Sequence, residues 1–440
     1  MRKANRKATV TETKAKKKLQ FRKKIYDNVH GYIDITEPER QLIDTPLFQR
    51  LRRVAHLGLA DYVYPGATHS RFSHCLGSMN VMHKLCLPLI DLEVLTYDDL
   101  SALRLAALLH DVGHYPFSHV TERTMRRLYG DQAKHELVGE FILRKTSLRK
   151  AVGRVCKPDI IRSIMRHDYE RPLFQYLVSS SLDVDKMDYL QRDSLHTGVA
   201  YGAFDVDRLL TSLVPDKGKN PTRLIVTRKG RQAIEDFLLG RYHMFQSVYY
   251  HKTVVAFELM LDRIIEDLIA RKALPDLQGL MKGIQRDERW LANYDDAFVW
   301  NVMKTTKNAN PVTRELIRML LSRESLKMAD EKLTLSPDAI PGVHEAMAKD
   351  DLSHWLSGPS GVSESWIFYK QQPPTTFLEI EDDETVHVET TNGKTIRIMD
   401  DPTSIIKKLW DSQFRAYRIY TRDHKSRELI EATLRKRMKS

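Results

Sequence analysis

Residues 108–119 read Leu108-Leu109-His110-Asp111-Val112-Gly113-His114-Tyr115-Pro116-Phe117-Ser118-His119. They end an apolar run that begins at Leu103 and predicts a buried helix. Gly113 and Pro116 predict that this helix stops within about one turn. A core helix would thus hold an imidazole and a carboxylate, those of His110 and Asp111, side by side on a rigid support. These two ligand types together suit Mn, Fe, Zn or Ni.

The alternative for such a pair is a structural helix that ends in a capping histidine and a solvated aspartate. The chain contains its own comparison, His167-Asp168, which neither Gly-His nor Ser-His follows. We predict that this second pair lies on the surface.

Further ligand-type side chains come from a predicted helix upstream, which opens with His69-Ser70-Arg71-Phe72-Ser73-His74. Arg71 and His74 are three positions apart, so they share one face of the helix. An imidazole and a guanidinium then point into the same cleft, as a metal ligand beside a phosphate-binding group.

A third predicted helix, within residues 182–193, presents Asp185, Tyr189 and Asp193 on one face. Two carboxylates and a phenol in a row are unusual for a structural helix. A solvated acidic face is the alternative for this segment taken alone. With the upstream segments it supplies a His, a His-Asp pair and a distant Asp, at His74, His110, Asp111 and Asp185.

In this order and context, the chain resembles the HD-domain metal-dependent phosphohydrolases. More narrowly, it resembles the dNTP triphosphohydrolases that join a sterile-alpha-motif domain to an HD domain, and their bacterial relatives. The resemblance extends from about residue 23 to about residue 252, and its most specific segments are 44–52, 64–74, 110–119 and 183–189. Only a short basic tail precedes Ile25, so we expect no sterile-alpha-motif domain.

The resemblance implies that His74, His110, Asp111 and Asp185 hold the metal. A bound metal lowers the pKa of water and neutralises phosphate charge, as attack on phosphorus requires. The resemblance also makes His119 the general acid that protonates the departing 5′ oxygen. Glu122, where the family usually has Asp, would orient that imidazole one helical turn away. The remaining family positions around the water and phosphates are His114 and His135.

Substrate contacts follow from the same resemblance. Two basic side chains match positions that contact the triphosphate, namely Arg71 and Lys186. Four others match positions near the sugar or base, namely Tyr189, Asp193, Tyr249 and His251. His56 stands where the close relative has Gln beside the deoxyribose, and an imidazole differs from an amide in reach and donors. The selection of deoxyribose over ribose is therefore left open.

Nucleotide activation at subunit contacts is a further implication, and the matching residues are Lys23, Asp44 and Arg52. The alternative for the last two is structural. Asp44, which Thr-Pro follows, would be the N-cap of a helix, and Arg52 would be a surface arginine. GTP or a dNTP would be the activator, and the chain would form a dimer or tetramer.

Composition fits an intracellular enzyme. The chain has 440 residues and three cysteines without paired spacing, which indicates a reduced, cytoplasmic protein. It has no run of about 18 apolar residues, so we expect no membrane span. The net charge of +12 is concentrated in the two end segments, and such tails contact RNA or DNA phosphates weakly.

The predicted fold is mainly α, with a helical HD-domain core and a smaller mixed α+β C-terminal lobe. We divide the chain into a basic tail (1–24), an HD-type phosphohydrolase domain (25–300) and the C-terminal lobe with its basic end (301–440). Residues 223–227 are predicted to form a strand, and residues 385–398 a hairpin around Asn392-Gly393. The segment 414–420 also alternates and is expected to pair with this hairpin.

The function predicted from these observations is metal-dependent hydrolysis of a dNTP to a deoxynucleoside and inorganic triphosphate. The alternatives are an HD phosphohydrolase of another nucleotide, and a nucleotide-sensing or nucleic-acid-binding regulator. The residues leave open which metal is used, whether Mg accompanies it, and which base is preferred.

Overall fold

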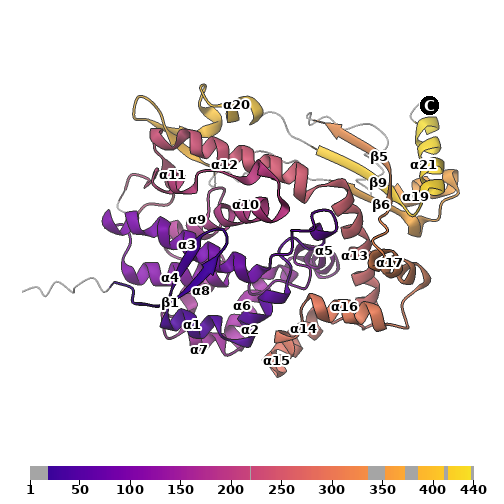
Figure 1. The fold of residues 1–440 in the computed structure, drawn as a ribbon, viewed down its shortest axis with the longest axis horizontal. Coiled ribbons are helices and arrows are strands. Elements are labelled where there is room, and N and C mark those ends of the chain that lie inside the picture. The colour runs from indigo at the N-terminus through magenta and orange to yellow at the C-terminus, as the bar shows by residue number, and fades with distance from the viewer. Residues whose placement is uncertain (1–17, 219, 335–351, 372–384, 411–414, 438–440) are drawn as a thin grey trace, which may run out of the picture.

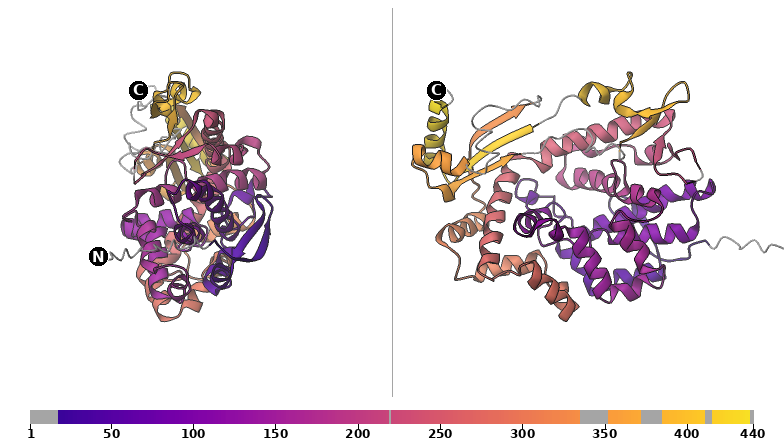
Figure 2. Two further views of the ribbon diagram at one scale, coloured as in Figure 1. Left: turned by 90° about the vertical axis from the view of Figure 1, so that its left-hand side faces the viewer. Right: turned by 180° about the vertical axis from the view of Figure 1, so that it is seen from behind.

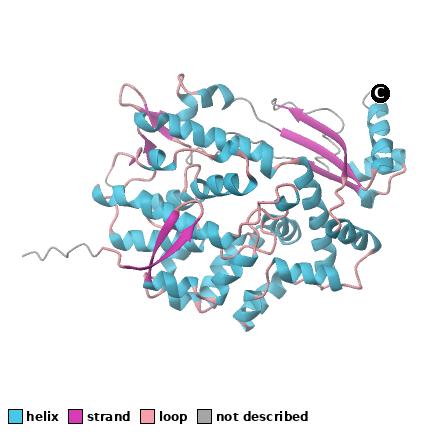
Figure 3. Cartoon of the chain, in the orientation of Figure 1, coloured by secondary structure: helices cyan, strands magenta, loops and turns pink. Residues whose placement is uncertain are grey.

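Helices make up most of the computed structural model, which describes residues 18–218, 220–334, 352–371, 385–410 and 415–437 (Figures 1 and 3). Residues 1–17 of the predicted basic tail and residues 438–440 lie outside this range. The helices are α1 (Glu37–Ile43), α2 (Pro46–Gln49), α3 (Arg71–Asp91), α4 (Tyr97–Leu109), α5 (His119–Tyr129), α6 (His135–Lys145), α7 (Leu148–Val152), α8 (Pro158–Met165), α9 (Pro172–Val178), α10 (Val184–Thr197), α11 (Val206–Leu210), α12 (Arg231–Met244), α13 (Lys252–Ala270), α14 (Leu277–Arg286), α15 (Glu288–Ala292), α16 (Asp296–Thr305), α17 (Pro311–Leu321), α19 (Leu352–Ser360), α20 (Ile405–Trp410) and α21 (His424–Arg437).

Strands form three small sheets among the described residues. The strands are β1 (Phe21–Asp27), β2 (Gly31–Thr36), β3 (Leu213–Pro215), β4 (Leu224–Val226), β5 (Lys327–Thr334), β6 (Ile367–Gln371), β7 (His387–Glu389), β8 (Thr395–Arg397) and β9 (Arg415–Thr421). Their orders are β1-β2, β3-β4-β7-β8 and β5-β9-β6. The mainly helical fold with a smaller mixed C-terminal part is thereby confirmed.

The centre of the fold is α3, which packs against both α4 and α10. Because α3 is apolar on most of its faces, it is buried along most of its length. The helix α4 begins with a capping box between Thr96 and Asp99 and ends at its cap residue, His110. The predicted helix end is confirmed, and it places the His-Asp pair between α4 and the next turn.

The N-terminal hairpin of β1 and β2 packs on this centre through Ile33 and Ile35, which are buried. Its turn uses Gly31 at a φ of +69°, a conformation that favours glycine. A capping box between Thr36 and Glu39 then starts α1. The hairpin thus packs against the helices through β2 and leads directly into α1.

The predicted strand at 223–227 and the predicted Asn392-Gly393 hairpin both form, as β4 and as the antiparallel pair β7 and β8. The expected pairing of 414–420 with that hairpin is wrong. Strand β9 pairs instead with β5 and β6, while β7 pairs with β4 in parallel. Alternation identifies a strand but carries no information about its partner. Phe414 lies outside the described residues.

Figure 2 shows the sheet of β5, β9 and β6 with α19 and α21 at one end of the molecule. The strands β7 and β8 extend the sheet of β3 and β4 beside α12. They therefore cross the boundary predicted near residue 300, and the division into 25–300 and 301–440 stays a prediction. No helix in the described part of the chain combines the length and apolarity that a bilayer span requires.

Candidate metal centre and active site

Four ligand-type side chains from three helical segments converge at one point. The Nε2 atom of His74, on α3, lies 2.8 Å from Oδ1 of Asp185 on α10 and 3.2 Å from Nε2 of His110. Nε2 of His110 lies 3.3 Å from Oδ1 of Asp111 and 3.5 Å from Oδ1 of Asp185. His74 and Asp111 are 3.7 Å apart. The structure thus brings together the four predicted metal ligands.

Hydrogen bonds to the opposite ring nitrogens orient both imidazoles. Nδ1–H of His74 donates to Oδ2 of Asp188 at 2.8 Å, and Nδ1–H of His110 donates to the backbone oxygen of Ala107 at 2.7 Å. Each bond leaves Nε2 free to bind a metal.

The donor set fits a divalent transition metal. Ligand atoms that bind one ion at about 2.0–2.2 Å are themselves about 3 Å apart, and His74, His110 and Asp185 have this spacing. Burial lowers the pKa of His74, but hydrogen bonds and charge from Asp185 and Asp188 outweigh it and raise the pKa to about 10. A bound cation replaces the proton that this imidazole otherwise keeps.

Arg71 is buried beside the cluster and anchors one of its carboxylates. Its Nη1 donates to Oδ2 of Asp111 at 2.7 Å, and its Nε donates to Oγ of Ser118 at 2.9 Å. Nη2 donates to the backbone oxygen of His56 at 3.3 Å. Although burial raises the pKa of Asp111, the charge of Arg71 holds it well below its ordinary value. The Asp111 carboxylate is therefore negatively charged at neutral pH.

A constrained turn leads into His119, the first residue of α5. Phe117 and Ser118 both have positive φ angles, of +56° and +51°, which cost energy for residues other than glycine. The carboxylate of Asp296 holds this turn, because it accepts hydrogen bonds from the backbone nitrogens of Phe117 at 2.7 Å and Ala55 at 2.8 Å. Asp296 thereby links this turn to the segment around Ala55 that precedes α3.

Three histidines and one carboxylate form the neighbouring group. His119 Nδ1 lies 3.1 Å from Oε2 of Glu122, and His135 Nδ1 lies 3.0 Å from Oε1 of the same side chain. His114 stacks on His135 with ring centroids 3.9 Å apart, and its Nε2 lies 3.1 Å from Oδ1 of Asp111. Glutamate thus has the reach to hold both rings, where the resemblance had placed a shorter aspartate.

A second buried carboxylate, that of Asp193, lies on α10 two turns after Asp185. Its Oδ1 lies 2.7 Å from Nε2 of His69, and its Oδ2 accepts a hydrogen bond from the Tyr249 hydroxyl at 2.7 Å. His56 Nε2 lies 3.7 Å from Oδ1. The rings of Tyr189 and Tyr249 meet edge to face. The predicted sugar-contacting residues other than His251 therefore form one cluster with His56.

Lys186 and His251 are placed differently. The ammonium of Lys186 lies 3.0 Å from Oδ2 of Asp183, the capping residue of α10. His251 caps α13, because its Nδ1 accepts a hydrogen bond from the Thr253 nitrogen at 3.3 Å. Among the described residues, no contact joins His251 to the cluster around Asp185 or to the cluster around Asp193.

The residues predicted to bind an activating nucleotide, Lys23, Asp44 and Arg52, are all exposed. Asp44 ends α1 and accepts a hydrogen bond from Arg40 at 2.6 Å, while Thr45 caps the start of α2. The alternative interpretation of Asp44 as a helix N-cap is therefore wrong by one residue. Arg52 lies over the Phe72 ring at 3.6 Å.

The comparison pair His167-Asp168 is exposed, as predicted. The sequence interpretation missed three groups that contact the site, namely His69, Ser118 and Asp188. For Asp188 a signal existed, since it follows Asp185 by three positions and so lies on the same face of a helix.

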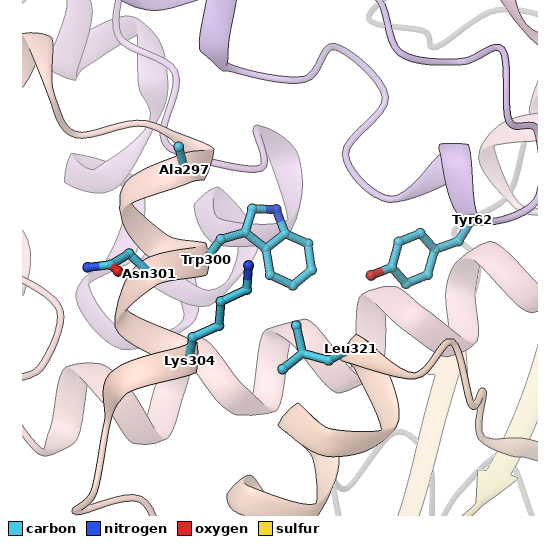
Figure 4. A pocket seen from close by; sticks show the side chains of 6 residues that line it. All are labelled: Tyr62, Ala297, Trp300, Asn301, Lys304 and Leu321. Carbon is cyan, nitrogen blue, oxygen red and sulfur yellow. The ribbon is translucent and has the colours of Figure 1, made fainter.

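A separate open pocket of about 460 Å³ is lined by Tyr62, Ala297, Trp300, Asn301, Lys304 and Leu321 (Figure 4). None of the predicted site residues lines it. The Trp300 ring contacts Phe117 edge to face, with centroids 5.3 Å apart. This pocket therefore lies behind the turn that leads into His119.

Comparison with known protein families identifies the segment that carries this cluster. The HD domain matches residues 71–193, a range that includes His74, His110, Asp111 and Asp185. The HD associated region matches residues 204–435. The chain belongs to the HD-domain family. The HD fold is that of phosphohydrolases that use a divalent metal, and the His/Asp cluster is a candidate site for one.

This chain is similar in sequence or structure to several HD-domain proteins. An uncharacterized protein of Methanocaldococcus jannaschii is 35% identical over 286 residues, 65% of this chain and 56% of that protein. A Dictyostelium discoideum homolog of the deoxynucleoside triphosphate triphosphohydrolase SAMHD1 is 27% identical over 342 residues, 74% of this chain and 63% of that one. The crystal structure of a phosphohydrolase from Bacteroides thetaiotaomicron has a TM-score of 0.72 at 26% identity, covering 91% of this chain and all of that one. The HD-family chain thus spans little more than half of the M. jannaschii relative.

Proposed function

We propose that this HD-domain protein is a metal-dependent deoxynucleoside triphosphate triphosphohydrolase. One observation carries the proposal: His74, His110, Asp111 and Asp185 form one cluster, and His114 links it to His119, which is exposed and held by Glu122. The relatives named as dNTP triphosphohydrolases support the choice of substrate.

In the proposed reaction, a water oxygen bonds to the α-phosphorus and the bond from that phosphorus to the 5′ oxygen breaks. A divalent metal bound by the four ligands supplies Lewis acidity and lowers the pKa of the attacking water. The leaving 5′ oxygen takes a proton from His119, whose imidazole Glu122 orients. The products are a deoxynucleoside and inorganic triphosphate.

We assign roles to the other residues from their charge and position. Arg71 pairs with Asp111, and Lys186 pairs with Asp183. Both basic side chains would offer positive charge to the phosphates. His114 and His135 are assigned to the side of the cluster where phosphate oxygens would bind. Asp193 is assigned to the 3′ hydroxyl, because Tyr249 and His69 hold its carboxylate in place.

The test is to load the protein with Mn²⁺, incubate it with each of the four dNTPs, with and without GTP, and separate the products. Deoxynucleoside and triphosphate in equal amounts support the proposal. Release of pyrophosphate with a monophosphate, or of single phosphates, contradicts the assigned bond. Stimulation by GTP tests the activator predicted at Lys23, Asp44 and Arg52.

Ribonucleoside triphosphates are the second candidate substrates. The reason to test them is His56, whose imidazole lies 3.7 Å from Asp193, where the resemblance places an amide beside the deoxyribose. Running the four NTPs in the same assay decides between the two sugars. The oligomeric state and the cytoplasmic location stay predictions.

A further inference from the structure

Asp188 lies at the centre of a buried network that the proposed reaction does not use. Its Oδ2 accepts hydrogen bonds from Nδ1–H of His74 at 2.8 Å and from Nε of Arg192 at 2.9 Å. Its Oδ1 contacts Nε2 of His30 at 2.6 Å and accepts from Nη2 of Arg192 at 2.9 Å. Because donors occupy both oxygens, Asp188 is not itself a free ligand.

The other end of this network is the turn between β1 and β2. Arg192 also pairs with both oxygens of Asp27, at 2.9 and 3.1 Å. Asp27 in turn accepts hydrogen bonds from the backbone nitrogens of Val29 and His30. Two routes therefore join the hairpin turn to Asp188, one through the His30 ring and one through Arg192.

The packing of α3 against α10 is shaped around the same carboxylate. Gly77 follows His74 by three residues, and a Cβ atom at this position would lie 1.8 Å from Oδ1 of Asp188. The side chains of His30, His74, Asp188 and Arg192 are at most 3% exposed. The carboxylate thus occupies space that any other residue at position 77 would take.

We propose that Asp188 is the positioning residue of the metal centre, and that the Asp27–His30 turn of the N-terminal hairpin holds it in place. This inference rests on the proposed function, because it takes His74 to be a metal ligand. The physical reason is that a carboxylate on Nδ1 fixes the tautomer and rotation of the imidazole and makes Nε2 a better ligand. The turn of the hairpin, more than 40 residues before His74 in sequence, is thereby part of the metal site.

The experiment measures Mn²⁺ affinity of the full chain, from the electron paramagnetic resonance of free Mn²⁺. His30→Leu removes the donor, His30→Gln keeps an N–H donor of similar reach, and Asp188→Asn removes the carboxylate charge. Gly77→Ala displaces Asp188 from the α3 side. The matched control is Glu39→Gln, which weakens the buried ion pair with Arg104 and touches none of these residues.

We expect His30→Leu, Asp188→Asn and Gly77→Ala to weaken Mn²⁺ binding about 10- to 100-fold. His30→Gln should bind more tightly than His30→Leu, and Glu39→Gln should bind as the unmodified chain does. Unchanged affinity in His30→Leu and Asp188→Asn overturns the inference and leaves the proposed function intact. If Asp188→Asn does not fold, the Mn²⁺ affinities of the two His30 variants and of Gly77→Ala decide whether the inference holds. An unmodified chain that binds no Mn²⁺ contradicts both the inference and the proposed function.

Discussion

Nδ1 of His119 lies 3.1 Å from Oε2 of Glu122, yet the histidine side chain is 59% exposed and the glutamate only 8%. The buried carboxylate thus holds an imidazole that faces the solvent side of the cluster. This is the arrangement that a proton donor to a bound substrate requires, because the ring is both oriented and accessible.

The first prediction concerns this pair. We expect His119→Gln to lower kcat by about 10²- to 10⁴-fold, the usual contribution of a general acid. Metal content should stay unchanged, because His119 is outside the group of four ligands. Glu122→Gln should cause a smaller loss, since the ring remains but loses its orienting charge. Metal analysis and steady-state kinetics on both variants test this, and a metal-depleted His119→Gln protein would contradict it.

The second prediction concerns Asp185, whose side chain is 31% exposed at the edge of the cluster. Asp185→Ala should abolish metal-dependent turnover while the protein still folds, because it removes a ligand from a polar site and leaves the core packing intact. Asp168→Ala, at an exposed position, is the control. Turnover retained together with bound metal would remove Asp185 from the ligand set.

The third prediction is a pH dependence of metal binding. The pKa of His74 is about 10 in the folded protein, above its ordinary 6.5, because Asp185 and Asp188 outweigh the effect of burial. Without metal, this interaction stabilises the fold fully below about pH 6.5 and is lost as the pH rises through about 10. Metal must displace this proton, so Mn²⁺ affinity should rise about tenfold per pH unit between pH 6.5 and 9.

Titrations at three pH values in this window check the slope. His74→Gln should make the slope shallower, since the amide carries no such proton. Affinity of the unmodified chain that does not change with pH would show that His74 binds metal without releasing a proton.

The fourth prediction concerns the cluster of side chains around Asp193. Tyr249→Phe removes a hydrogen bond to a buried carboxylate and should lower kcat/KM about tenfold or more, mainly through KM. Asp193→Asn should cost more, because it also changes the partner of His69. Assays with a dNTP and with a 2′,3′-dideoxynucleotide compare a substrate that has the 3′ hydroxyl with one that lacks it. The variant effects should shrink with the dideoxy substrate, and equal losses on both substrates would place Asp193 away from the 3′ hydroxyl.

The sequence by itself determined the local elements that carry the ligands. The apolar run that stops at Gly113 and Pro116 placed the end of α4 at His110, and Asn392-Gly393 placed a hairpin turn. These features depend on periodicity, caps and turn residues within a few positions, so a short window contains the whole signal. The four proposed ligands were identified as a set through the resemblance, since spacing alone left a solvated acidic face open at Asp185.

Only the tertiary structure decided which distant groups meet. His30 and Asp188 are 158 positions apart, and His69 and Asp193 are 124 apart, yet both pairs are in contact. The partners of β9 were likewise set by packing and not by its alternation. Such contacts depend on how α3, α10 and the hairpin pack together, because the free energy of a buried pair belongs to the assembled core and to neither segment alone.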